Sequence, residues 1–479
     1  MTQGGVSANV QLALGDVTLT SISAFRFWNW TPHNDPDYTA LDVSREGNQF
    51  DRQRQWSQEF RLASTGTRAI DYVIGVYAFH QSIRGWFTNE YGRDAGEFLI
   101  APGTAGLTPT QRRAALEGTF TYAPSKPQTT SFAAFGQATW HLGPVFDLTG
   151  GLRYTHERKY GYYEQVRGGG SALSTLNAAQ VALRNAYTPI YPRYELDRSW
   201  GDVSGLATIS AKLTADVLAY ATYSRGQKSG GLNFATLPLS ATGAPLLELA
   251  VVAPEKVDNY ELGLKTQFFD RHLTANVSLF RTDVTNYQST IVDASVTPAR
   301  AYIANIGKVR SKGVELDVRA RPVTGLSLYG SATYNPAEYT RYTNAQCPFE
   351  LRAPGQPTVC DLSGRQLPAA PKRAWAAGGS YDAPLGSRIT GFVGADYAYR
   401  SSFYTSYNLS RYSLIDGFGL ANARIGIRGP DGRWEVSLWG RNVFDKLTYY
   451  TKGVSENGGV FYGLTGDPRT FGITFRTRS

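Results

Sequence analysis

The side chains that could support enzyme chemistry are scattered along the sequence and form no catalytic pattern. No HExxH metal-protease pattern and no GxSxG nucleophile pattern occurs. The glycine-rich stretch 168–170 is followed by Ser171 but by no Lys-Ser/Thr pair, so it does not provide a phosphate-binding loop. The sequence therefore predicts no enzyme activity and no cofactor. The histidines stand in separate segments, at His33, His80, His141, His156 and His272.

The two cysteines, Cys347 and Cys360, lie in one Pro-rich segment. There is no CxxC pair and no His-rich tract, so no metal site is expected. A local disulfide formed in an oxidising compartment is the favoured interpretation, with two free thiols as the alternative.

The composition favours a membrane β-barrel. The 479 residues include 50 Gly, 30 Tyr and 23 Phe but one Met, and the mean hydropathy is −0.30. A helical membrane protein needs apolar runs of roughly 18 residues or more, and none occurs. A barrel with a water-filled lumen keeps its mean hydropathy low because only its lipid-facing side chains are apolar. The net charge of +9 is spread along the chain, so no nucleic-acid partner is expected.

Many segments alternate apolar and polar side chains with a period of two, as strands do. In the segment 273–279, Leu273, Ala275, Val277 and Leu279 share one face, and the residues between them are polar. A soluble sandwich also alternates, so one such segment decides little. A long series with charges on the second face, however, indicates a water-filled lumen.

The connections between these segments are alternately short and long, as in barrels with tight periplasmic turns and long outer loops. The short turns are expected at Gly15-Asp16, Thr65 to Arg68, Gly143-Pro144, Ala215-Asp216, Asp270 to His272, Pro322 to Gly325, Pro384 to Ser387 and Gly429 to Gly432. The long polar stretches lie near 29–53, 83–128, 157–199, 226–255, 285–310, 336–372, 401–415 and 446–468.

The pattern predicts about 17 strands of an antiparallel up-and-down barrel, an odd number where bacterial single-chain barrels have an even one. The first strand runs into a short turn, so the chain enters the barrel from the extracellular side. We therefore expect at least one strand upstream. The N-terminal residues 1–5 do not form a secretory signal, which an outer-membrane barrel needs, so either the numbering begins inside a longer precursor or the barrel interpretation is wrong. The predicted strands are near 8–14, 17–27, 55–64, 70–81, 130–141, 146–156, 203–213, 217–225, 258–269, 273–284, 311–321, 326–335, 373–382, 388–400, 418–428, 433–443 and 469–477.

Several segments resemble signatures of TonB-dependent outer-membrane receptors, in the order usual for that family and over nearly the whole chain. The resemblance is to the branch that takes up iron–siderophore complexes. The matching segments are Trp56-Ser-Gln-Glu-Phe-Arg-Leu-Ala-Ser64, Tyr223-Ser-Arg-Gly-Gln-Lys-Ser-Gly-Gly231, Pro254-Glu255 with Tyr260-Glu-Leu-Gly-Leu-Lys265, Gly313-Val-Glu-Leu316, Leu367-Pro368 with Ala370-Pro371, Gly440-Arg-Asn-Val-Phe-Asp-Lys446, and Gly466-Asp-Pro-Arg-Thr-Phe-Gly472.

The resemblance implies a barrel of about 22 strands around an N-terminal plug of roughly 130–150 residues. Neither a plug nor a TonB-box segment is visible in the sequence, so residues 1–479 are expected to form one barrel domain that lacks the plug and about five strands. Family members commonly end in an aromatic residue, whereas this sequence ends Phe475-Arg-Thr-Arg-Ser479.

The resemblance further implies a Gram-negative outer-membrane receptor, monomeric and surrounded by lipid. Its ligand would be a ferric siderophore or a similarly large nutrient, and the TonB–ExbB–ExbD complex would energise uptake through the plug. Two other functions stay open: a passive porin-like channel and, more distantly, a soluble all-β glycan-binding protein or adhesin.

An anionic ferric siderophore would need cationic and aromatic side chains in the outer loops and the upper lumen. Candidates stand at the predicted upper strand ends. Each has a structural alternative, because Tyr can belong to the interfacial girdle and Arg can pair with lumen carboxylates. The candidates are Arg153, Arg158, Arg225, Lys228, Tyr399, Arg400, Tyr404 and Arg441.

Overall fold

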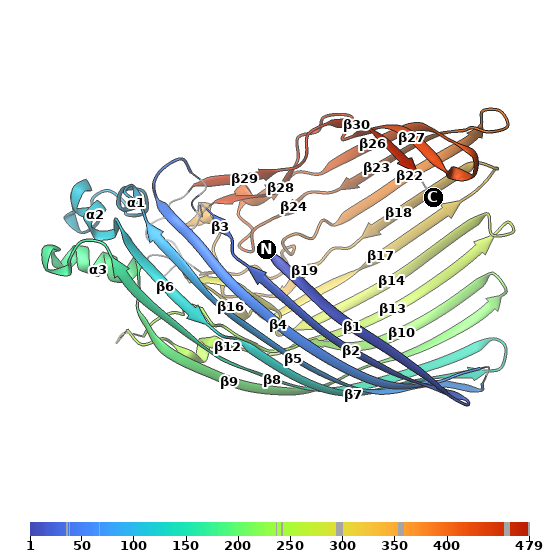
Figure 1. Cartoon of the computed structure of the whole chain (residues 1–479), viewed down its shortest axis with the longest axis horizontal. Helices are drawn as coiled ribbons and strands as arrows, with labels where there is room; N and C mark the ends of the chain where they lie inside the picture. The colour runs from blue at the N-terminus through green and yellow to red at the C-terminus, as the bar shows by residue number, and fades with distance from the viewer. Residues whose placement is uncertain are drawn as a thin grey trace.

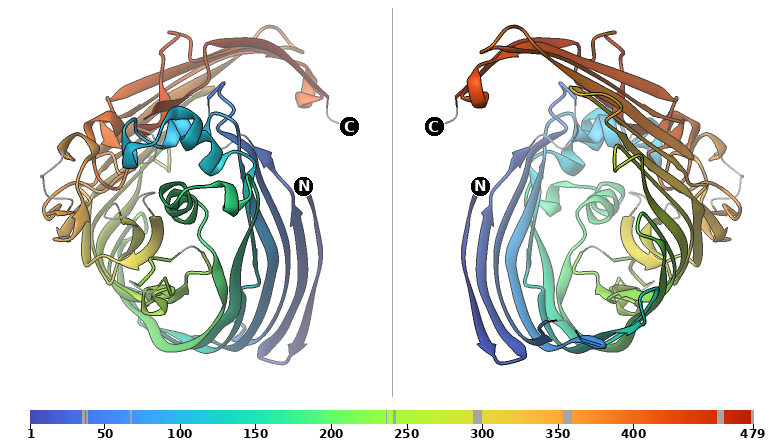
Figure 2. Two further views of the ribbon diagram at one scale, coloured as in Figure 1. Left: turned by 90° about the vertical axis from the view of Figure 1, so that its left-hand side faces the viewer. Right: turned by 90° about the vertical axis from the view of Figure 1, so that its right-hand side faces the viewer.

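The structure is a computed structural model that describes residues 1–34, 37, 39–66, 68–235, 237–240, 243–293, 300–352, 359–454 and 460–477. Residue 67 of a predicted turn, parts of the predicted long loops and residues 478 and 479 lie outside these ranges. One large antiparallel sheet dominates the fold and curves most of the way around a hollow (Figure 1; Figure 2).

The sheet contains 17 long strands, and β3, β6 and β19 are short strands joined to it near its outer end. The long strands pair in chain order. They are β1 (Thr2–Leu14), β2 (Val17–Trp30), β4 (Ser44–Ser64), β5 (Ile70–Tyr91), β7 (Gln128–Leu142), β8 (Phe146–Gly169), β9 (Tyr191–Thr214), β10 (Val217–Lys228), β13 (Glu255–Phe268), β14 (Leu273–Thr285), β17 (Lys308–Ala320), β18 (Leu326–Tyr334), β22 (Arg373–Pro384), β23 (Thr390–Arg400), β26 (Phe418–Arg428), β27 (Trp434–Arg441) and β30 (Thr470–Thr477).

The predicted all-β fold is confirmed. Each predicted strand overlaps one long strand, and where a predicted strand extends beyond the observed one, the excess is at most two residues. The alternation arises because one face of the sheet is apolar and the other polar. Leu279, for example, lies opposite Leu262 and Val314 on its two neighbouring strands. Paired residues in a sheet share a face, so the register extends the apolar face from strand to strand.

The short connections gather at one end of the sheet, on the right in Figure 1, and the long connections at the other end. The outer end also contains helices and short strands that the sequence did not predict. The helices are α1 (Ala95–Leu99), α2 (Pro109–Leu116) and α3 (Ala178–Tyr187), with the 3-10 turns η1 (Thr104–Gly106), η2 (Leu173–Thr175), η3 (Leu247–Ala250), η4 (Phe349–Leu351) and η5 (Arg411–Ser413). A sixth 3-10 turn, η6 (Pro430–Gly432), lies in the short turn between β26 and β27 at the opposite end. The short strands are β3 (His33–Asn34), β6 (Thr119–Ser125), β11 (Gly231–Leu232), β12 (Val251–Val252), β15 (Gln288–Asp293), β16 (Arg300–Asn305), β19 (Glu338–Arg341), β20 (Ala345–Gln346), β21 (Val359–Cys360), β24 (Phe403–Tyr404), β25 (Leu414–Ile415), β28 (Tyr449–Val454) and β29 (Phe461–Thr465).

Several strands extend far beyond their predicted ends. The strand predicted at 146–156 continues to Gly169 in β8, and the strand predicted at 203–213 begins at Tyr191 in β9. These two strands stay paired outward as far as Gln165 and Tyr191. Where both faces of a strand meet water, the apolar alternation that signals a strand stops before the backbone pairing does.

The two faces of the sheet differ in exposure and chemistry. On the outer face Leu262 and Leu279 are 58% and 53% exposed, as lipid-facing side chains are in the absence of lipid. The inner face of the strands from β14 to β30 is polar and borders a hollow of about 930 Å³, whose lining includes Asp396, Asn422 and Arg424. The outer face is therefore the lipid-facing side and the inner face is the lumen.

The buried core lies in the outer loops rather than between the strands. One cluster surrounds Tyr191 and Leu237, a second surrounds Tyr339 and Tyr342, and a third surrounds Leu116. These clusters hold the long loops together above the hollow wall.

In the part of the chain that the structure describes, no helix is long and apolar enough to cross a membrane.

The sheet has two free edges. Among the described residues, β1 pairs in the sheet only with β2, and β30 pairs only with β27. The opening between the first and last strands is visible in both views of Figure 2. The strands therefore form a curved wall rather than a closed ring.

Candidate functional site

The inner face of the wall combines guanidinium groups with aromatic rings. The Arg153 guanidinium lies 5.5 Å from the centre of the Tyr77 ring and 5.7 Å from that of Phe135. Near the other edge of the sheet, on β27, the Arg441 guanidinium lies 5.2 Å from a ring centre of Trp439, and both residues border the hollow. This arrangement offers flat cationic surfaces to an anionic or aromatic ligand in the lumen.

Carboxylates and amides complete this inner surface. Arg428 contacts Asp382 and Glu435 at 3.3 and 3.2 Å, and Asn422 Nδ2 donates to Asp396 Oδ2 at 2.7 Å. These polar groups of the wall are therefore paired with one another. This pairing is the structural alternative to ligand contact that the sequence left open.

Three other candidates lie at the upper end of the wall or in its loops. The Arg400 guanidinium lies 5.0 Å from the centre of the Phe418 ring on the neighbouring strand. The Lys228 ammonium lies 3.4 Å from Oε1 of the buried Glu255. Tyr404 is half-buried against the cluster around Tyr339. With Arg153 and Arg441, these residues are the five candidates that lie on the inner face or in the outer loops.

The remaining three candidates, Arg158, Arg225 and Tyr399, face away from the lumen. Arg158 is two positions from His156 and four from Tyr154 on the outer face of β8, and it forms an ion pair with Asp197. Strand register also places Arg225 and Tyr399 on the outer face. The expectation that these three side chains line the upper lumen is therefore not met.

Strand register decides the orientation of Arg225 and Tyr399. Arg225 lies opposite Asp258 on β13, two residues above the outer-face pair Tyr223 and Tyr260. Tyr399 lies opposite Trp375, with 5.9 Å between the ring centres. Tyr399 thus belongs to the outer aromatic surface, as the structural alternative proposed.

Sequence reasoning missed Trp439 and Arg424 on the inner face. These two residues lie opposite each other on β27 and β26. Each directly neighbours an outward-facing apolar residue, Ile425 on β26 and Leu438 on β27, and therefore points inward. Counting alternate positions from these apolar residues, instead of the distance from the strand end, would have found them.

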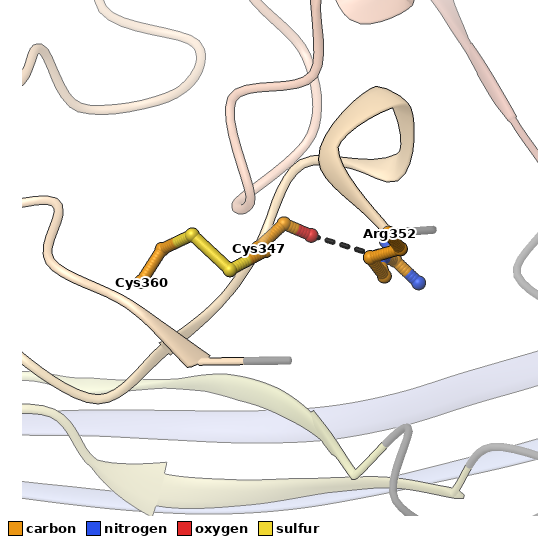
Figure 3. The surroundings of a disulfide bond; sticks show 3 residues. All are labelled: Cys347, Arg352 and Cys360. Carbon is orange, nitrogen blue, oxygen red and sulfur yellow. Dashed lines mark hydrogen bonds between the residues drawn. A yellow bond between two sulfur atoms is a disulfide. The ribbon is translucent and has the colours of Figure 1, made fainter. Parts of the chain in front are cut away.

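A disulfide between Cys347 and Cys360 cross-links the outer loop between β18 and β22 (Figure 3). The bond links residues 13 positions apart: Cys347 directly follows β20, and Cys360 is the last residue of β21. Arg352 Nε donates a hydrogen bond to the Cys347 carbonyl oxygen at 2.8 Å (Figure 3). The cross-link therefore fixes the base of the loop that contains η4.

Glu350 connects this loop to the next one. Ser410 Oγ and the Arg411 backbone N–H donate to its two carboxylate oxygens at 2.7 and 2.8 Å. Burial alone would raise the pKa of Glu350, but these hydrogen bonds outweigh burial and lower it. The carboxylate therefore stays ionised at neutral pH and holds the two loops in register.

Replacing both Cys347 and Cys360 with serine is expected to destabilise the cross-linked loop by about 3 kcal/mol. A disulfide that closes a loop of about 15 residues lowers the conformational entropy of the unfolded chain by an amount equivalent to that free energy. Amide hydrogen exchange over 338–352 and 359–367 should become faster, with no change in β13 and β14. Ser410→Ala keeps the cross-link and removes one hydrogen bond to Glu350. It should lower the free energy of local opening, measured by amide exchange, by only about 1 kcal/mol. Two free thiols in protein from native membranes, or unchanged exchange in the double serine variant, would contradict this prediction.

The helices at the outer end form a compact cap around Arg184. Its guanidinium donates to the carbonyl oxygens of Ala115, Ser171 and Ala114 at 2.7, 2.6 and 2.8 Å. Two of these carbonyls, those of Ala114 and Ala115, belong to the last turn of α2. Carbonyl groups in the last turn of a helix have no hydrogen-bond partner within the helix. Arg184 is 2% exposed, so α3 is fastened to α2 by buried charge-assisted hydrogen bonds.

Within the described ranges, no group of three or more His, Cys, Asp or Glu side chains is placed to hold a metal ion.

Comparison with known proteins decides the family of this wall. The family profile described as "TonB dependent receptor-like, beta-barrel" matches residues 2–443. The chain belongs to this family. It is accordingly a β-barrel protein of the Gram-negative outer membrane, and the family consists of transport receptors rather than enzymes.

Two curated relatives of this TonB-dependent receptor chain are named as siderophore receptors. The ferric-pyoverdine receptor PbuA of Pseudomonas sp. strain M114 is 30% identical over 279 residues, which cover 57% of this chain and 29% of PbuA. The catecholate siderophore receptor Fiu of Escherichia coli O6:H1 is 26% identical over 351 residues, covering 72% of this chain and 41% of Fiu. The matches thus span less than half the length of these relatives.

Solved structures share the fold over almost the whole chain. The ferric yersiniabactin uptake receptor FyuA of Yersinia pestis superposes with a TM-score of 0.73 at 18% identity, covering 99% of this chain and 61% of FyuA. The siderophore receptor PiuA of Acinetobacter baumannii gives a TM-score of 0.69 at 15% identity, with 99% and 63% covered. These structural similarities support the barrel fold.

Proposed function

We propose that the whole protein imports a ferric siderophore across the outer membrane. The observation that carries this proposal is the inner face, where Arg153, Arg400 and Arg441 lie against aromatic rings. A guanidinium beside a ring suits an anionic iron chelate, because it offers charge-assisted hydrogen bonds and a stacking surface together. The names of PbuA and Fiu, which refer to pyoverdine and catecholate siderophores, support the same ligand class.

We propose that residues 1–479 supply the C-terminal part of the barrel wall. The free edges of β1 and β30 support this proposal, because a spanning barrel leaves no sheet edge unpaired in the hydrocarbon. FyuA, of which this chain covers 61%, is also longer. In the whole protein further strands would bridge the two edges, and a plug coupled to the TonB–ExbB–ExbD complex would occupy the lumen. No enzyme activity is part of this function.

A passive porin-like channel is the less favoured function. It would share the wall and the polar lumen, but it would need neither a large-ligand site nor an energy source. The named relatives are receptors rather than channels. The soluble glycan-binding alternative is excluded by the family and its outer-membrane location.

Growth on defined iron sources tests the proposal. Deleting the intact gene is expected to abolish growth on at least one ferric siderophore in iron-poor medium and to leave growth on abundant iron salts unchanged. A deletion strain that uses every siderophore as well as its parent does would contradict the proposed ligand class.

Arg441→Ala in the intact protein is expected to weaken siderophore binding about tenfold or more, because it removes a charge-assisted contact worth about 1.5–3 kcal/mol. Arg158→Ala is the matched control, since Arg158 projects from the outer face. Fluorescence titration with the growth-supporting ferric siderophore measures both affinities. Equal affinities for the two variants would remove Arg441 from the binding surface.

A further inference from the structure

A second charged surface lies on the outside of the wall, above its apolar band. It is carried by four adjacent strands, β10, β13, β14 and β17, which lie side by side in Figure 1. Register places all of its side chains on the lipid-facing side. We call it the cationic shelf, and it consists of Arg225, Lys256, Arg281, Arg310 and Lys312 with Asp258 and Asp283.

The register fixes the height of the shelf relative to the lipid-facing side chains. Leu262, Leu279 and Val314 form one row across β13, β14 and β17, and the next outer-face row is Tyr260, Arg281 and Lys312. The side chains change from apolar to aromatic and cationic within that single step. Such a change marks the membrane interface, where tyrosines sit at headgroup level.

The carboxylates of the shelf neutralise only part of its charge. Asp283 pairs with Arg281 at 2.8 Å and with Arg310 at 2.6 Å, and Asp258 accepts a hydrogen bond from the Tyr223 hydroxyl at 2.7 Å. Among the ion pairs of the described residues, none includes Arg225, Lys256 or Lys312. Five cations and two carboxylates leave an excess of positive charge on this face.

The neighbouring strand β19 does not remove this excess. Glu338 lies opposite Arg310, but Lys308 lies opposite Arg341 in the same strand pair. The shelf thus stays cationic when the next strand is counted.

The most informative pair is Arg281 and Lys312, which lie directly opposite each other. Like charges placed opposite each other on neighbouring strands destabilise a sheet. Both side chains are exposed, so an anion placed between them would convert a repulsive pair into a binding site. A phosphate group suits this geometry, because the guanidinium binds two oxygens and the ammonium a third.

We propose that the cationic shelf binds the phosphorylated headgroup of an outer-leaflet lipid, with Arg281 and Lys312 at its centre. The occupant is a lipid rather than a soluble anion because the shelf continues without interruption into the apolar rows that acyl chains cover. The proposal requires only the outer-membrane location of the wall, so it is independent of the siderophore proposal.

The test uses the intact protein, purified in neutral detergent and titrated with lipid A, which carries phosphates on its sugar headgroup. Exchanging both Arg281 and Lys312 for glutamine is expected to weaken lipid A binding about tenfold, equivalent to about 1.4 kcal/mol. The matched control is Lys265→Gln with Arg319→Gln, which removes two charges from the inner face of β13 and β17. The control should bind lipid A within about twofold of the unaltered protein.

Dephosphorylated lipid A and inorganic phosphate complete the experiment. Weak binding of the dephosphorylated lipid is expected, and inorganic phosphate should compete only poorly because it cannot use the apolar rows. Equal loss of binding in the shelf and inner-face variants would overturn the proposal, as would tight binding of dephosphorylated lipid A. Inorganic phosphate binding as tightly as lipid A would show a soluble-anion site and would overturn the lipid assignment. Heat-modifiable mobility on gels verifies that each variant is folded.

Discussion

Val277→Arg is expected to destabilise the folded wall by about 2–4 kcal/mol, because a cation on the lipid face near the middle of the bilayer cannot be solvated. Val277 is 37% exposed on the outer face and lies between Leu264 and Leu316, one row deeper than the last apolar row below Arg281. Denaturant unfolding in lipid vesicles, followed by tryptophan fluorescence, measures the change. The expected result is a lower midpoint with an unchanged slope.

Ser278→Arg is the matched control, because Ser278 follows Val277 on the same strand and points to the opposite face. It lies opposite Glu315 and Gly263 on the inner side. An arginine there meets water and a carboxylate, so stability should change by less than about 1 kcal/mol. If Ser278→Arg destabilised the protein as much as Val277→Arg, the assignment of the two faces would be wrong.

Arg184→Ala is expected to loosen the helical cap by about 3 kcal/mol or more, because it removes three charge-assisted hydrogen bonds and leaves buried carbonyls of α2 unpaired. The effect should be local. Amide exchange over α2 and α3 should accelerate and limited proteolysis should cut near 100–118, while β13 and β14 keep their protection.

Arg113→Ala provides the control for the cap, since Arg113 lies on α2 itself. Its ion pair with Glu117, at 3.5 Å, is exposed to solvent. Removing it should therefore cost less than about 1 kcal/mol. Equal exchange rates in the Arg184 and Arg113 variants would show that Arg184 does not fasten α3 to α2.

The strand order could be predicted from the sequence wherever the two faces meet different media. Between Leu273 and Leu279 the side chains alternate because lipid lies on one side and water on the other, and the predicted strand at 273–284 matches β14 closely. The outer part of β8 gave no such signal, since both of its faces meet water. The odd number of long strands and the direction of the first one also agree with the prediction.

The helices of the cap did carry a local signal that the barrel pattern obscured. Asn177 and Gln180 form a capping box at the start of α3, and Thr108 and Gln111 form one at the start of α2. Such pairs indicate a helix start even inside a long loop. The contacts between α2 and α3 could not be predicted, because the partners of Arg184 on α2 lie about 70 residues away in the sequence.

The sequence located the candidate side chains on the strands but did not fix which face each of them occupies. Arg153 and Arg441 lie beside rings on the inner face, whereas Arg158 and Arg225 project outward. A one-residue change in parity moves a side chain across the wall. Distance from a strand end therefore cannot place a ligand contact, although parity counted from a lipid-facing leucine can.

Uptake of radioactive iron, supplied as the growth-supporting ferric siderophore, tests the central claim most directly. Cells that carry the intact gene should accumulate iron only while TonB is present, and cells that lack the gene should not accumulate it from that complex. Equal accumulation with and without TonB, together with passage of small neutral solutes through the purified protein in vesicles, would instead show a passive channel and would contradict the account.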